Sequence, residues 1–154
     1  MRPVHVLAAG ALLLASMAAW GAEPLVGVWR LDHQEVNGQE ANSEPMTLKI
    51  TQAGDKLAFA FSVPVNNIYF VSMSYTVKLD GTEADVKNAQ GDKVGSIRIT
   101  PGGASQYKMV LKSPNHPESD GKLTISPDGK TLISEAETQQ GGRTIHSKQT
   151  FSRN

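Results

Sequence analysis

The sequence of 154 residues contains no cysteine. Disulfides, thiolate metal sites and cysteine nucleophiles are therefore excluded. It also has no surplus of either charge, because 15 Lys and Arg balance 15 Asp and Glu and no long basic run occurs. Nucleic-acid binding needs clustered basic residues, so the sequence argues against a nucleic-acid partner. Glycine-rich phosphate loops, the Gly-x-Ser-x-Gly nucleophile motif and the His-Glu-x-x-His zinc motif are also missing.

Histidines are few, and none stands in a strong metal-binding pattern. His33 and His116 each have two carboxylates within four residues in the sequence, whereas His146 is expected on the outward face of a strand. In loops and at strand ends such groups are usually solvated, so we interpret all three as surface residues. Ionisable groups are almost absent from the expected interior positions, which disfavours catalysis. We therefore assign no catalytic residue, no metal site and no cofactor.

The first 21 residues have the pattern of a secretory signal peptide. Arg2 precedes an apolar run of 15 residues from Val6 to Trp20, which is shorter than the ~20 residues that a membrane-spanning helix needs. Small residues at the last and third-last positions favour cleavage after Gly21, with cleavage after Ala22 as the alternative. We therefore expect export to the periplasm or the medium without a stable membrane anchor, and a single domain at residues 22–154.

Beyond this segment, the sequence alternates between apolar and polar residues with the period of a β-strand. In residues 46–52, for example, Met46, Leu48 and Ile50 alternate with polar residues. Turn signals such as Asp80-Gly81 recur about every 10 to 15 residues, which leaves no room for crossover helices. We predict an all-β fold, an antiparallel up-and-down meander of about 8–10 strands closed into a small barrel. Residues 33–45 are predicted to be an irregular polar segment.

A short motif at the start of the first strand carries a family resemblance. Gly27-Val28-Trp29 resembles the Gly-x-Trp motif of the lipocalins and the wider calycin superfamily, in particular the small exported lipocalin-like domains of bacteria. The resemblance implies that Trp29 closes one end of the barrel and that Arg153, on the last strand, packs across it. Gly27, Trp29 and Arg153 are then structural. The expected strand number is nearer to that of the intracellular fatty-acid carriers of the same superfamily.

A group of aromatic, methionine and aliphatic residues is the candidate ligand-binding set. Methionine adapts to irregular shapes, and tyrosine combines an apolar ring with a hydroxyl that can orient a ligand. The candidates, which we expect to line a pocket or its mouth, are Phe59, Phe61, Tyr69, Val71, Met73, Tyr75, Met109 and Leu111. The alternative is that the same side chains simply fill the barrel, since a barrel of this size can be filled or can hold one ligand.

The sequence thus predicts an exported lipocalin-like protein that binds a small apolar or amphipathic molecule inside the barrel. Lipocalin-like bacterial protease inhibitors provide a second hypothesis, a protein-interaction module such as a periplasmic inhibitor. The resemblance would place its contacts at residues 22–25 and at the turn of residues 64–67. An open cavity favours the first hypothesis and a filled interior favours the second.

Overall fold

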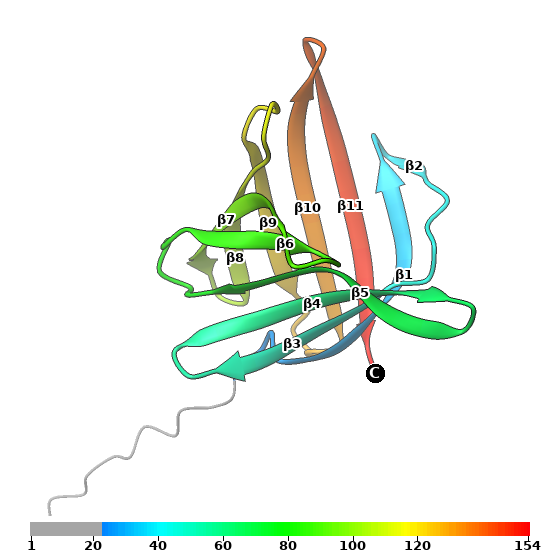
Figure 1. The fold of residues 1–154 in the computed structure, drawn as a ribbon, viewed down its shortest axis with the longest axis vertical. Helices are drawn as coiled ribbons and strands as arrows, with labels where there is room; N and C mark the ends of the chain where they lie inside the picture. The colour runs from blue at the N-terminus through cyan, green and yellow to red at the C-terminus, as the bar shows by residue number, and fades with distance from the viewer. Residues whose placement is uncertain (1–22) are drawn as a thin grey trace, which may run out of the picture.

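The computed structural model describes residues 23–154. The predicted signal peptide and its cleavage site lie outside the described residues. Within residues 23–154 all the regular structure is β, with no helix. The strands are β1 (Gly27–Val36), β2 (Gln39–Glu40), β3 (Thr47–Ala53), β4 (Lys56–Val65), β5 (Ile68–Val77), β6 (Ala84–Asn88), β7 (Lys93–Gly103), β8 (Gln106–Lys112), β9 (Ser119–Ile125), β10 (Thr131–Gln140) and β11 (Arg143–Arg153) (Figure 1).

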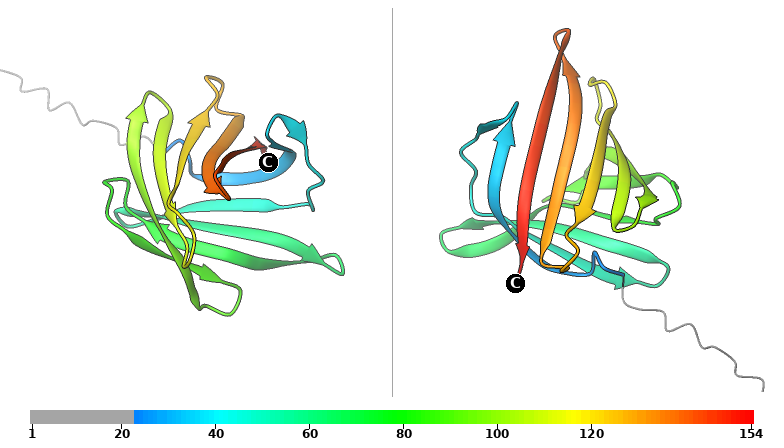
Figure 2. Two further views of the ribbon diagram at one scale, coloured as in Figure 1. Left: turned by 90° about the horizontal axis from the view of Figure 1, so that it is seen from above. Right: turned by 180° about the vertical axis from the view of Figure 1, so that it is seen from behind.

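The strands form one antiparallel sheet that closes on itself. Consecutive strands are neighbours from β3 to β11, and β11 pairs with β1 (Figure 2). Ten strands therefore make a closed up-and-down barrel, as predicted. The short β2 pairs with the C-terminal end of β1, whereas β3 pairs with its N-terminal part. Closure leaves no long sheet edge to be protected. In this part of the chain no helix is long and apolar enough to cross a membrane.

The core follows directly from the alternation of apolar and polar residues. On β3, Leu48 and Ile50 are buried whereas Lys49 and Thr51 are exposed. The same alternation on the other strands directs their apolar side chains inward. The largest fully buried side chains are Trp29, Phe59, Phe151, Leu25, Ile50, Leu57, Ile97, Ile99, Leu132 and Val77.

The prediction of an irregular segment at residues 33–45 is wrong in its first part. β1 continues to Val36, and Gln39–Glu40 forms β2. The polar side chains concealed this strand because Gln34 faces the interior, in register with Gln149, while Glu35 faces outward. A register shift between Leu31 and His33 also exchanges the two faces of β1, so the inward Gln34 and Val36 do not continue the alternation of Trp29 and Leu31, although the backbone ladder to β11 continues.

A β-bulge interrupts β5. Phe61 pairs with Met73, but the next residue, Ser62, pairs with Val71, so Ser72 is the extra residue. The Ser72 hydroxyl donates a hydrogen bond of 3.2 Å to the carbonyl oxygen of Phe61. Because one residue is inserted, the inward and outward positions of β5 are exchanged on the N-terminal side of the bulge.

Beyond the bulge, the β4–β5 hairpin projects from the barrel (Figure 1). Its two-residue turn has φ of 52° at Asn66 and 63° at Asn67, the left-handed conformation that asparagine tolerates and that this hairpin turn requires. The opposite edge of β5 pairs with β6 through only two residue pairs. The barrel wall is therefore weakest between these two strands.

Candidate functional site

One end of the barrel is closed by Trp29 and Arg153. The guanidinium carbon of Arg153 lies 4.1 Å from the centroid of the fully buried Trp29 ring. The guanidinium also donates hydrogen bonds of 2.7–2.8 Å to the carbonyl oxygens of Val26, Pro24 and Gly129. Arginine suits this place because its planar fork can stack on a ring and donate several hydrogen bonds at once.

The segment before β1 plugs the same end. Leu25 is completely buried, and its carbonyl oxygen accepts a 2.9 Å hydrogen bond from the Trp29 indole nitrogen. The Tyr107 hydroxyl donates to the carboxylate of Glu23, and burial together with this acceptor raises the pKa of Tyr107. A Cβ atom at Gly27, where φ is 155°, would collide with the Arg153 guanidinium. Gly27 therefore makes room for the cation above the indole.

A cavity of about 180 Å³ lies inside the barrel. Apolar side chains from seven strands form most of its wall. They include six of the eight candidate ligand-binding residues, namely Phe59, Phe61, Met73, Tyr75, Met109 and Leu111, together with Leu48, Ile97, Leu123 and Phe151. The cavity is smaller than the ~300–1,000 Å³ of most ligand pockets. The interior is thus partly filled by its own side chains and partly open.

Tyr75 is the central aromatic residue of this wall. Its ring stacks on Phe59, with centroids 4.7 Å apart, and its centroid lies 6.1 Å from that of Phe61. Burial raises the pKa of Tyr75, and no charged group contributes to that shift. The phenol is therefore protonated over the physiological range and offers a neutral donor beside the cavity.

The opposite wall, on β10 and β11, is polar, and the sequence reasoning did not single it out. Ser134, Ala136, Ser147 and Gln149 line the cavity there. The Gln149 amide nitrogen is 3.4 Å from the amide oxygen of Gln34. The alternation of these strands could have identified them, because Ser134 is two residues from the buried Leu132, and Ser147 and Gln149 are four and two residues from the buried Phe151. Residues separated by an even number of positions share one face of a strand. The cavity therefore has an apolar side and a neutral polar side.

Tyr69 and Val71, the remaining two candidates, do not line the cavity. The interpretation that they share a face with Met73 and Tyr75 is wrong because the bulge at Ser72 exchanges the faces of β5. Both lie on the projecting part of the β4–β5 hairpin. The exposed apolar side chains of this tip are Val65, Ile68, Tyr69, Phe70 and Val71, each 45–61% exposed.

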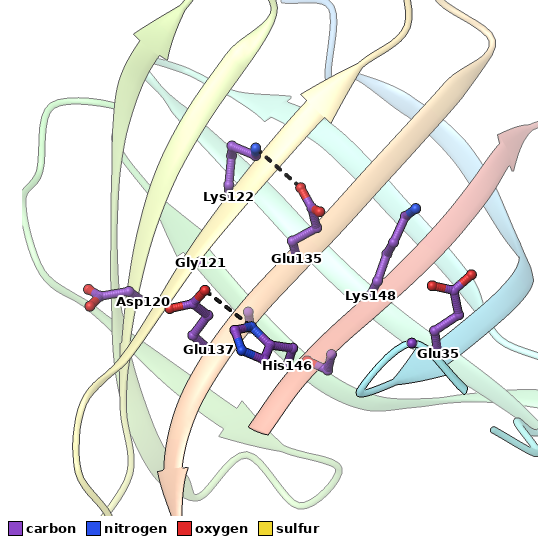
Figure 3. A pocket seen from close by; sticks show the side chains of 11 residues that line it. Glu35, Asp120, Gly121, Lys122, Glu135, Glu137, His146 and Lys148 are labelled. Carbon is purple, nitrogen blue, oxygen red and sulfur yellow. Dashed lines mark ion pairs between the residues drawn. The ribbon is translucent and has the colours of Figure 1, made fainter. Parts of the chain in front are cut away.

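A second, larger depression of about 410 Å³ lies on the outer face of the barrel (Figure 3). Its centre is a row of charges of alternating sign, with Lys122, Glu135, Lys148 and Glu35 in register across β9, β10, β11 and β1. The Lys122 ammonium is 3.3 Å from the Glu135 carboxylate. Opposite charges paired across strands stabilise a sheet, each by a few tenths of a kcal/mol to ~1 kcal/mol. We interpret this face as a solvated wall.

The three histidines among residues 23–154 are exposed or half-buried. His33 Nε2 lies 2.9 Å from the Glu35 carboxylate, and its Nδ1 lies 3.4 Å from that of Glu40. His146 Nδ1 is 3.1 Å from the Glu137 carboxylate. Among residues 23–154, no three His, Cys, Asp or Glu side chains are grouped as a metal would require.

Comparison with known proteins gives a fold relationship. No family model and no curated protein matches the sequence. Among solved structures, the chain is similar to the zebrafish ileal bile acid-binding protein, solved with cholic acid, with a TM-score of 0.60 and 16% identity over 86% of this chain and all of the other. The two chains therefore share the fold of a closed β-barrel. At this identity the similarity shows the fold alone.

Proposed function

We propose that this protein is exported and binds a small apolar or amphipathic molecule inside the barrel. The observation that carries the proposal is the internal cavity of about 180 Å³ with its apolar and neutral polar walls. A ligand there would gain about 25 cal/mol for each Å² of apolar surface removed from water. The similar structure, of a bile acid-binding protein with cholic acid, supports a carrier function for this kind of barrel.

Entry of a ligand is most easily accommodated between β5 and β6. The two residue pairs that join these strands, Met73 with Asn88 and Ser74 with Lys87, are the least extensive pairing within the barrel. Met73 itself lines the cavity. Separating the strands there breaks few backbone hydrogen bonds, so this region can open while the rest of the barrel stays intact.

Native mass spectrometry tests the carrier proposal directly. The protein is purified gently from the cell envelope of its own host and compared with the same sample after organic extraction. A discrete additional mass that extraction removes would support the proposal and identify the ligand. A bare polypeptide mass, with no shift when small neutral and anionic amphiphiles are added, would refute it.

A second candidate function, a protein-interaction module, rests on the β4–β5 hairpin. Its tip exposes five large apolar residues, and no charged residue occurs between Lys56 and Lys78. Exposed apolar patches of this kind often mark interaction sites. Of the contacts that the inhibitor hypothesis places at residues 22–25, Leu25 is buried in the core whereas Pro24 is exposed. If this function is the correct one, replacing Ile68 and Phe70 by serine will abolish capture of a specific envelope protein and leave ligand binding intact.

A further inference from the structure

The polar groups that line the cavity are all neutral. Ser134, Ser147 and Gln149 supply hydroxyl and amide groups, and no charged residue is among the lining residues that the structure describes. These three residues lie on the adjacent strands β10 and β11. Together they can both donate and accept hydrogen bonds.

Charged residues next to these positions, on β9, β10 and β11, lie on the outer face. Lys122, Glu135 and Lys148 are in register with one another on the outer face, where Figure 3 shows their side chains. The strict alternation of β-strands separates them from the neighbouring inward residues. The cavity therefore has no cation from this wall that could neutralise an anion.

The cation at the closed end does not supply one either. All three nitrogen atoms of the Arg153 guanidinium already donate to backbone carbonyl oxygens, and the group stacks on Trp29. Moving it toward the cavity would break those contacts. An ionised carboxylate without a partner is costly to bury, whereas a hydroxyl or carbonyl group needs only one or two neutral hydrogen bonds.

From this arrangement we infer that the ligand is a small uncharged amphiphile, such as an alcohol, ketone or amide, and not an ionised fatty or bile acid. Its carbon skeleton packs on Phe59, Phe61 and Met109, and its neutral polar group faces Ser134 and Gln149. The modest size of the cavity agrees with a compact ligand. This inference rests on the proposed function and defines the class of ligand for the same cavity.

The test uses two probes that differ in the polar group, octan-1-ol and octanoate, titrated calorimetrically into the protein at neutral pH. We expect octan-1-ol to bind at least about tenfold more tightly than octanoate, the ratio that corresponds to ~1.4 kcal/mol. Octanoate binding should strengthen as the pH falls toward the pKa of the free acid, because the neutral acid is then the species that binds. Equal or tighter binding of octanoate at neutral pH would overturn the inference while leaving the carrier function in place.

Matched serine variants locate the polar group of the ligand. Ser134→Ala removes a hydroxyl from the cavity wall, whereas Ser152→Ala removes one from the outer face of β11, in register with Arg30. Octan-1-ol should bind roughly threefold to tenfold more weakly to the first variant, the loss expected for one hydrogen bond, and with unchanged affinity to the second. Thermal unfolding of both variants checks that the fold is retained. If both variants bind octan-1-ol with the affinity of the parent protein, the assignment of the polar wall is wrong. If the parent protein binds neither octan-1-ol nor octanoate, the proposed carrier function itself is refuted.

Discussion

Removing the Arg153 guanidinium should destabilise the barrel by a predictable amount. The side chain is exposed, so its three hydrogen bonds to carbonyl oxygens are taken at the low end of their usual contribution, about 0.5 kcal/mol each. Stacking of an exposed cation on Trp29 contributes roughly 0.5–1 kcal/mol more. We therefore expect Arg153→Ala to lower the free energy of unfolding by about 2–2.5 kcal/mol. Arg153→Lys retains the charge but not the fork and should lose about half as much.

The assay is urea unfolding at neutral pH, followed by the fluorescence of Trp29 in a chain that begins at residue 22. Calorimetry should show a fall in the midpoint temperature of roughly 3–5 °C for each kcal/mol, given the size of the domain. Arg143→Ala, at the exposed turn between β10 and β11, is the matched control and should change stability by less than about 0.5 kcal/mol. If Arg153→Ala is no more destabilising than this control, the argument that the cation holds the end of the barrel closed is refuted.

Three further predictions follow from burial and charge. Phe59 is 1% exposed and Phe70 is 52% exposed, so urea unfolding should show that Phe59→Ala costs about 3–5 kcal/mol and Phe70→Ala less than about 1 kcal/mol. Because burial raises the pKa of Tyr75, native parent and Tyr75→Phe proteins should give equal tyrosinate absorbance at about pH 10.5 and should differ only after unfolding. The contribution of the neutral Tyr75 phenol to the free energy of unfolding is complete below the pKa of tyrosine in the unfolded chain, about 10, and it falls as the pH rises above that value. The Lys78 ammonium, 2.8 Å from the Asp55 carboxylate, lowers the pKa of that carboxyl. The parent should therefore be more stable than Asp55→Asn at about pH 6, and this difference should vanish as the pH falls through the lowered pKa toward about pH 2. A difference that is constant with pH would exclude the ion pair as its source.

Most of the barrel could be predicted because its strands have one apolar and one polar face. The alternation of residues 46–52 predicted a strand, which the structure shows as β3 at Thr47–Ala53. The prediction failed where this contrast is lost. Residues 33–35 are polar on both faces, and the register shift between Leu31 and His33 takes Val36 out of the alternation set by Trp29 and Leu31, so the end of β1 was interpreted as irregular.

The candidate site was only partly predictable, for a different physical reason. Phe59 and Tyr75 could be placed inside by alternation alone, but the bulge at Ser72 has no signature in the sequence. It reverses every position that precedes it on β5, including Tyr69. Serine is more often exposed than buried, so the place of Ser134 on the polar wall follows only once it is known which strands surround the cavity.

The base and the tip of the β4–β5 hairpin have different surroundings. Its base supplies Phe59 and Phe61 to the cavity, and its tip exposes Ile68 and Phe70 to solvent. The absence of charge from residue 57 to residue 77 is explained at the base by burial, but no burial explains it at the tip. The bulge at Ser72 separates the two parts by exchanging the faces of the strand. Substitutions at the tip and at the base should therefore have independent effects, and a change in ligand affinity caused by Ile68→Ser would show that the tip is part of the route to the cavity.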